Sequence, residues 1–168
     1  MDVAALRAAQ APLKARYRDD PATAVTPVRA RATFAEPGVT CTVATAAGPV
    51  RAGLHAATGG TGADVCSGDM MMEALLACTG VTVRSVATAM RLEVRGAELT
   101  ADGVFDARGT LGLDRDVAVG VQGVVVTVEL DTDADDAALE RLATLTERYC
   151  VVAQSLRDTP RIVVRRRG

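Results

Sequence analysis

Residues 70–90 form the segment that most limits how this chain can fold. Apolar side chains recur there at helical spacing, and the only charged residues between positions 70 and 91 are Glu73, Arg84 and Arg91. A helix that is apolar nearly all round is buried, so we expect this one between a sheet and a second layer. One small domain can hardly cover such a helix, which favours a partner subunit.

Shorter patterned segments surround this helix. The expected strands are 28–34, 39–45, 50–56, 97–107, 120–130 and 162–164, and the expected helices are 3–18, 70–90 and about 135–157. Ser67 or Asp69 is the expected N-cap of the helix at 70–90. The order of elements predicts an α+β fold with mostly antiparallel pairing. No repeat or linker divides the 168 residues, so we expect a single domain over 1–168.

Composition excludes several classes of function. Aromatic residues make up 2% and the net charge is −2, so neither a base-stacking surface nor a phosphate-binding patch is expected and nucleic acid is excluded as a partner. The start of the chain lacks the continuous apolar region of a signal peptide. The most apolar stretch, 117–130, contains Gln122 and Glu129 and is shorter than the roughly 20 residues of a membrane span. We therefore expect a cytoplasmic protein without a membrane partner.

Four cysteines, at positions 41, 66, 78 and 150, are the main candidates for chemistry. Their wide spacing, with no C-x-x-C, does not fit the paired ligands of a zinc site, and no metal is expected. In the cytosol these thiols are reduced at rest. Cys78 and Cys150 each lie near the middle of an expected long helix. They are either small core residues or, if the helices pack together, a redox pair.

The segments around these two cysteines resemble one known family. Residues 67–82 (SGDMMMEALLACTGVT) resemble the first-cysteine helix of the OsmC/Ohr family, and residues 147–156 (ERYCVVAQSL) resemble its second-cysteine helix. The resemblance covers about residues 27–165, and the helix at 3–18 looks like an extension. It implies an OsmC-like intertwined homodimer, in which curved sheets wrap around two long central helices and active sites lie at the subunit interface.

The resemblance also implies an activity. The family's enzymes are thiol-dependent peroxidases that reduce organic hydroperoxides, with no metal or organic cofactor. Cys78 would be the thiol that attacks the peroxide, and Cys150 would resolve its sulfenic acid to a disulfide. An external dithiol, a lipoyl-bearing protein in the best-known members, would restore both thiols.

Activation of the first thiol is where this sequence departs from the family. A thiol in an apolar helix has a raised pKa, and the family's peroxidases counter this with an arginine and with a glutamate in an Asn-Pro-Glu-like motif. Here Cys66-Ser67-Gly68-Asp69 replaces that motif, and Asp69 is the nearest acid. The candidate arginines are Arg29, Arg31 and Arg51. Cys66, near the helix start, is a further candidate for a reactive or resolving thiol.

Two other functions stay open at this point. The chain could be a non-catalytic dimer that binds a small hydrophobic ligand, with its cysteines as core residues. It could also be a hydrolase with a Cys78–His55–Asp69 site, although a lone histidine at a strand end is more often structural.

Overall fold

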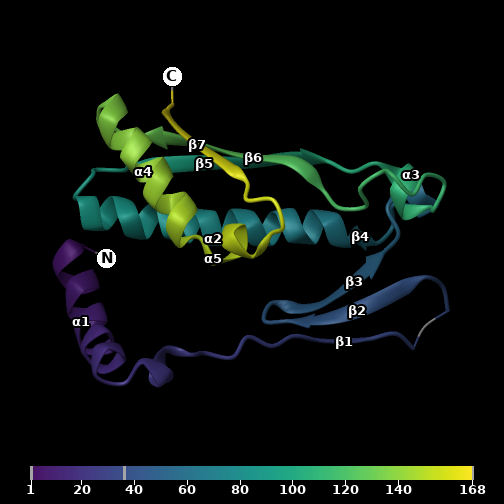
Figure 1. Cartoon of the computed structure of the whole chain (residues 1–168), viewed down its shortest axis with the longest axis horizontal. Coiled ribbons are helices and arrows are strands. Elements are labelled where there is room, and N and C mark those ends of the chain that lie inside the picture. Colours follow the sequence, from purple (N-terminus) through teal and green to yellow (C-terminus); the bar gives the residue numbers. More distant parts are fainter. Residues whose placement is uncertain (1, 36, 168) are drawn as a thin grey trace.

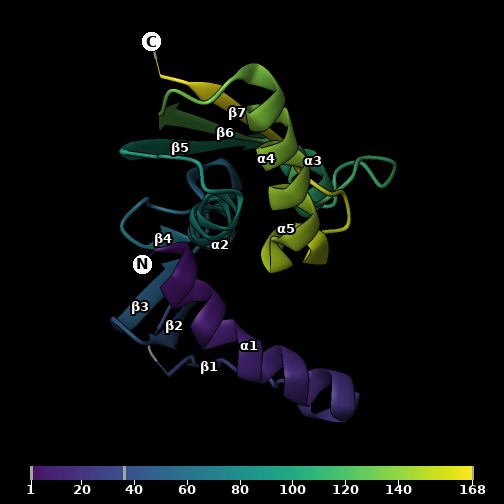
Figure 2. The same cartoon turned by 90° about the vertical axis from the view of Figure 1, so that its left-hand side faces the viewer.

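The computed structural model describes residues 2–35 and 37–167 and places two sheets on opposite sides of a long helix (Figures 1 and 2). The first sheet, in the order of the strands, consists of β1 (Arg31–Thr33), β2 (Thr40–Thr45), β3 (Gly48–Gly53) and β4 (Val65–Cys66). The second consists of β5 (Gly96–Val104), β6 (Gln122–Asp131) and β7 (Arg161–Arg166). The helices are α1 (Val3–Asp19), α2 (Ser67–Met90), α3 (Ala107–Thr110), α4 (Asp136–Tyr149) and α5 (Val151–Ser155).

The pairing of the strands confirms the predicted α+β fold. Strands β1, β2 and β3 pair antiparallel, as do β5 and β6. Two parallel pairings, β3 with β4 and β6 with β7, were not predicted. Most expected elements are present with ends that differ by a few residues; the exceptions are the strand expected at 28–34 and the helix expected at about 135–157.

The core lies between the second sheet and three helices. Alternate residues of β6 (Val126, Val128 and Leu130) are fully buried, as the period of a strand with one covered face requires. The inner face of α2 and residues of α4, α5 and β7 complete this cluster. These contacts fix α2 against α4 and α5.

Only one stripe of α2 is buried within the chain. Leu75, Thr79, Val83 and Ala87 face the core, whereas Val81 on the outer face is 73% exposed. Within a single chain the helix is therefore covered on one side only, as expected for a helix that one small domain can hardly cover. Among the described residues, α2 is also the one helix long and apolar enough to cross a membrane. From the sequence, only residues 117–130 were considered as a possible span. The length and composition of α2 are weak evidence for a span, because a core helix passes the same criterion.

Two predictions about helix ends are wrong. Cys66, not Ser67 or Asp69, is the N-cap of α2, and its side chain makes no capping hydrogen bond. The helix expected at about 135–157 is two helices, because Cys150 has the extended backbone angles φ −76° and ψ 104°. The side-chain amide of Gln154 donates through Nε2 to the backbone carbonyl oxygen of Glu147 at 2.8 Å, which satisfies a backbone acceptor at the end of α4.

The amino-terminal part of the chain is loosely attached to the rest. Helix α1 leads away from both sheets, with only its first turns beside α2 (Figures 1 and 2). Strand β1 is shorter than the expected 28–34, and its three residues are exposed. Val28 and Phe34 on either side of it are 94% and 84% exposed. These large apolar side chains are therefore left uncovered by the described part of the chain.

Candidate functional site

Cys78 and Cys150 come together where three helices meet. Cys78 lies in the middle of α2 and is half-buried, while Cys150 lies at the junction of α4 and α5 and is fully buried. Both are free thiols. The sequence predicted this meeting only on the condition that the two long helices pack together, and they do.

The environment of Cys78 favours its thiolate. Burial raises the pKa of the Cys78 thiol, but interactions with the backbone N–H of Val152, the Cys150 side chain, the N–H of Val151 and the Thr82 hydroxyl together outweigh it. The pKa of Cys78 is therefore below its ordinary value. The two N–H groups belong to the first turn of α5, where backbone donors have no partner within the helix.

The helix break at Cys150 thus has a chemical consequence. An uninterrupted helix would tie the N–H groups of Val151 and Val152 to carbonyl groups one turn earlier. Because α4 ends at Tyr149 and α5 begins at Val151, these two N–H groups lie outside such a ladder and contribute to the lowered pKa of Cys78. The role of the Val151 and Val152 backbone was not predicted from the sequence. The local signal for a break in the helix is that both residues are β-branched, which lowers helix propensity.

Two threonines surround the second thiol. The Thr79 hydroxyl lies 3.6 Å from the Cys150 sulfur, and both are fully buried. Thr146, one turn before Cys150, is also fully buried, and its hydroxyl has no hydrogen-bond partner in the described part of the chain. A buried hydroxyl without a partner destabilises the folded state.

We expect Thr146→Val to raise the free energy of unfolding by about 1 kcal/mol, because it removes an unpaired polar group at nearly constant volume. Urea denaturation measures this change. Thr144→Val is the matched control, since Thr144 lies on the same helix and its exposed hydroxyl donates to Glu140. That control is expected to change stability by no more than about 0.5 kcal/mol. A loss of stability in Thr146→Val would show that the hydroxyl has a partner in solution.

The predicted activating residues lie at exposed or ion-paired positions. Asp69 is exposed in the first turn of α2, nine residues before Cys78 and thus about 13 Å away along the helix axis. Arg29 and Arg31 are exposed, and Arg51 pairs with Asp64 at 3.1 Å. Among the described residues, none of these four is a group that shifts the pKa of Cys78.

His55 lies with a different cysteine. It lines a cavity together with Cys66, and its ring packs edge-on against Phe105 at 5.2 Å. Its Nδ1 accepts a hydrogen bond from the Ala57 N–H at 3.0 Å. With Nδ1 accepting, the neutral ring carries its proton on Nε2, so it lacks the Nε2 lone pair that a hydrolase base uses, and the described partners of Cys78 do not include His55.

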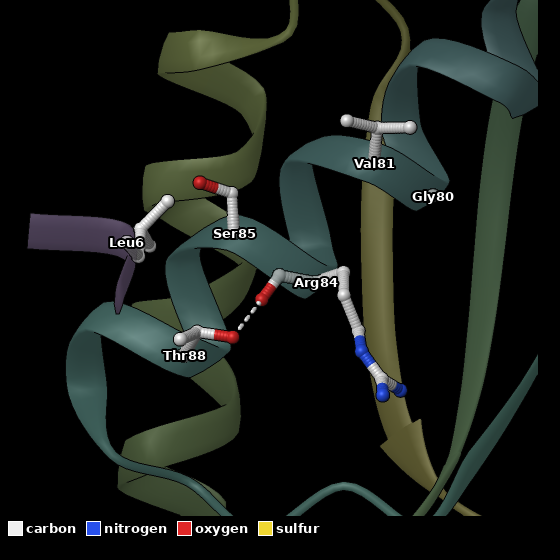
Figure 3. A pocket seen from close by; sticks show the side chains of 6 residues that line it. All are labelled: Leu6, Gly80, Val81, Arg84, Ser85 and Thr88. Atoms are coloured by element: carbon white, nitrogen blue, oxygen red, sulfur yellow. Dashed lines mark hydrogen bonds between the residues drawn. The ribbon is translucent and has the colours of Figure 1, made fainter. Parts of the chain in front are cut away.

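An apolar groove follows the outer face of α2. Leu6 of α1 closes one side, and Val81, Arg84, Ser85 and Thr88 of α2 form the floor around a volume of about 460 Å³ (Figure 3). This groove is the feature that best suits the hydrophobic-ligand alternative. No group of three or more His, Cys, Asp or Glu side chains within residues 2–35 and 37–167 is arranged to hold a metal ion.

Two sheets around a central helix, with two thiols at the helix junction, define an α+β protein that carries a candidate two-cysteine redox site. Comparison with protein families identifies the group within this class. The chain belongs to the family of OsmC-like proteins, whose family model matches residues 60–165. A search of curated protein sequences gave no match.

Solved structures show the same fold at low sequence identity. An OsmC-like protein of unknown function from Vibrio cholerae has a TM-score of 0.67 at 16% identity, covering 85% of this chain and all of its own. An OsmC-like protein from Mycoplasma pneumoniae scores 0.66 at 12% identity, covering 84% and 96%. The organic hydroperoxide resistance protein OhrB of Bacillus subtilis scores 0.56 at 18% identity, covering 83% and 98%. The OsmC/Ohr resemblance seen in the sequence is confirmed.

Proposed function

We propose that this protein is a thiol-dependent peroxidase that reduces organic hydroperoxides, with Cys78 as the attacking thiol and Cys150 as the resolving thiol. The observation that carries the proposal is the lowered pKa of Cys78, to which the side chain of Cys150 contributes. A low-pKa thiol beside a resolving cysteine is the arrangement that reversible peroxide chemistry needs. Membership of the OsmC-like family and the likeness to OhrB support it.

The reaction uses the two thiols in sequence. The Cys78 thiolate attacks the distal oxygen of the hydroperoxide, the O–O bond breaks, and the alkoxide leaves as the alcohol after taking a proton. Cys78 is then a sulfenic acid. The Cys150 sulfur attacks the Cys78 sulfur, a disulfide forms, and the hydroxyl group leaves as water. An external dithiol, for which a lipoyl-bearing protein is the candidate, reduces the disulfide by exchange. None of these steps requires a metal or an organic cofactor.

The proposal includes a homodimer in the cytoplasm. Within one chain the outer face of α2, β1 and its apolar neighbours are exposed, and a second copy would cover them. In this proposal a symmetric partner also brings Asp69 and one of Arg29, Arg31 and Arg51 to Cys78. We further propose that residues 1–168 form one OsmC-like unit, with α1 as an extension.

Peptide mass spectrometry after one equivalent of cumene hydroperoxide tests the proposed function. The expected result is a Cys78–Cys150 disulfide in the wild-type protein and none in Cys78→Ser. Cys41→Ser is the control, since Cys41 lies in β2, outside the junction of α2, α4 and α5. Unchanged thiols in the wild-type protein would refute the peroxidase. Binding of an apolar ligand in the groove beside Leu6 would then be the better function.

The contribution of the α5 amino end can be tested with Val151→Pro. Val151 is the first residue of α5 and follows a residue with extended angles, so proline fits without distortion and removes one N–H donor. We expect the pKa of Cys78 to rise. Because only the thiolate attacks peroxide, the midpoint of the pH–rate profile should move to higher pH. At pH values below the midpoint, oxidation of Cys78 should slow by up to about tenfold for each unit by which its pKa rises. Rates at high pH should be equal. Val151→Ala, which keeps the N–H, should behave like the wild-type protein; an unshifted midpoint in Val151→Pro would contradict this role.

A further inference from the structure

A second cysteine cavity lies apart from the Cys78–Cys150 pair. It has a volume of about 370 Å³ and is enclosed by the loop after β3, the amino end of α2 and the connection between β5 and β6. Cys66 and His55 both line it. Met71, on its floor, precedes Cys78 by seven residues, which is about 10 Å along α2. The proposed peroxidase chemistry uses neither Cys66 nor His55.

The loop fixes the orientation of His55. The His55 carbonyl oxygen accepts hydrogen bonds from the Thr58 N–H at 2.9 Å, the Thr58 hydroxyl at 2.9 Å and the Gly60 N–H at 3.0 Å. A Cβ at Gly60 would overlap the Leu54 carbonyl oxygen, so this close approach requires glycine. Because Nδ1 accepts from the Ala57 N–H, the neutral ring carries its proton on Nε2. His55, which lines the cavity, therefore carries a hydrogen-bond donor at Nε2.

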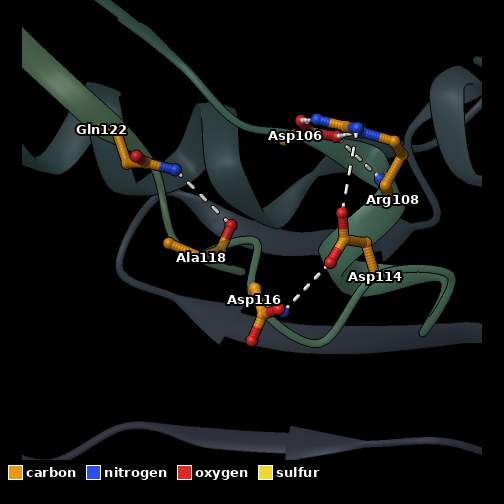
Figure 4. A network of polar contacts seen from close by, with 6 residues as sticks. All are labelled: Asp106, Arg108, Asp114, Asp116, Ala118 and Gln122. Atoms are coloured by element: carbon orange, nitrogen blue, oxygen red, sulfur yellow. Dashed lines mark hydrogen bonds and ion pairs between the residues drawn. The ribbon is translucent and has the colours of Figure 1, made fainter.

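The opposite wall is held by a polar network (Figure 4). Phe105 and Val121 lie on this wall, at the two ends of the connection between β5 and β6. Between them, Arg108 pairs with Asp106 at 2.6 Å and with Asp114 at 3.9 Å, and the Asp114 carboxylate accepts from the Asp116 N–H at 3.1 Å. These contacts stabilise the connection between β5 and β6.

The residues that line this cavity indicate which kind of molecule it can bind. The described residues around this cavity include apolar side chains, a thiol, a histidine donor and the Ser67 hydroxyl, but no Lys, Arg, Asp or Glu. An uncharged apolar molecule with a hydrogen-bond acceptor fits such a lining. We propose that this cavity is a covalent capture site, in which the Cys66 thiol adds to small apolar α,β-unsaturated carbonyl compounds.

The addition needs no further reactant. The Cys66 sulfur forms a bond to the β-carbon, and the electron pair of the C=C bond moves toward the carbonyl oxygen. The His55 Nε2–H donates to that oxygen as negative charge develops on it. The α-carbon then takes up the proton that the thiol released, so the net change is addition of S–H across the double bond.

The test uses the variant Cys78→Ser/Cys150→Ser, in which only Cys41 and Cys66 remain, and the probe trans-2-octenal. Cys41 is a matched internal control, because it is also half-buried and lines an apolar cavity that has no histidine. We expect peptide mass spectrometry to show Cys66 modified at least about tenfold faster than Cys41, the size of effect of one well-placed hydrogen bond. The wild-type protein, treated in the same way, should show the same preference between these two residues.

A second variant separates hydrogen bonding from thiol exposure. His55→Phe keeps an aromatic ring against Phe105 but removes the donor, so the reaction of Cys66 with octenal should slow about tenfold. Its reaction with methyl iodide, which has no acceptor, should be unchanged. Equal rates at Cys41 and Cys66 would overturn the proposal. An equal slowing of both reagents in His55→Phe would also overturn it, because that result indicates a structural role alone.

Discussion

Replacing Cys150 by serine is expected to abolish peroxidase turnover while leaving the first oxidation of Cys78 possible. Without a resolving thiol, the sulfenic acid at Cys78 has no partner within the chain and advances to the sulfinic acid when peroxide is in excess. Steady-state turnover with a dithiol should fall by more than about 1000-fold, equivalent to roughly 4 kcal/mol in the barrier. A coupled assay measures the loss, and peptide mass spectrometry identifies the oxidised form of Cys78.

The control for this prediction is Cys66→Ser, which removes a half-buried thiol outside the α2–α4–α5 junction. It should retain turnover and should not accumulate sulfinic acid at Cys78. If Cys66→Ser behaved like Cys150→Ser, the resolving role would belong to Cys66, and the proximity of Cys150 to Cys78 would be only a packing contact.

The elements that sequence could predict are those with strong local signals. Asp135 caps α4 through its carboxylate, which accepts from the Ala138 N–H at 2.8 Å, and such caps are readable from residue type alone. The alternation of β6 marks one buried face in the same way. The two-residue strand β4 leaves no periodic pattern, so its parallel pairing with β3 was beyond prediction.

The candidate site was predictable only in part, for a related reason. Cys78 and Cys150 were found because their flanking residues resemble a known family. The break at Cys150 depends on the extended backbone at that residue and is accompanied by a contact over seven residues, from Gln154 to the Glu147 carbonyl. Neither leaves a periodic signal. The donors from Val151 and Val152 are backbone groups, which side-chain motifs do not reveal.

The outer face of α2 shows a further limit of the sequence. Its apolar pattern predicts burial but cannot say whether the same chain or a partner supplies the cover. Within the chain that face stays open at Val81, and the proposed homodimer assigns the cover to a second copy.

Val81→Glu is expected to convert the proposed dimer into monomers. Across a two-fold axis the substitution appears on both subunits, and each carboxylate would be buried without a partner. An uncompensated buried charge costs about 3–5 kcal/mol, so the dimer Kd should rise at least about 100-fold. Sedimentation velocity at micromolar concentration measures the change. Peroxidase activity should fall with the dimer if the partner supplies Asp69 or an arginine to Cys78.

Leu113→Glu is the matched control for this substitution. Leu113 is 74% exposed, nearly the same as Val81, but it lies in the connection between α3 and β6, away from the outer face of α2. A glutamate there should leave both association and activity unchanged. A Val81→Glu protein that remains dimeric would place the interface elsewhere, and a wild-type protein that sediments as a monomer would mean that α2 keeps an open apolar face. For a monomer, the activating acid and arginine of Cys78 would have to come from the same chain, which the position of Asp69 in the first turn of α2 and the Arg51–Asp64 ion pair oppose.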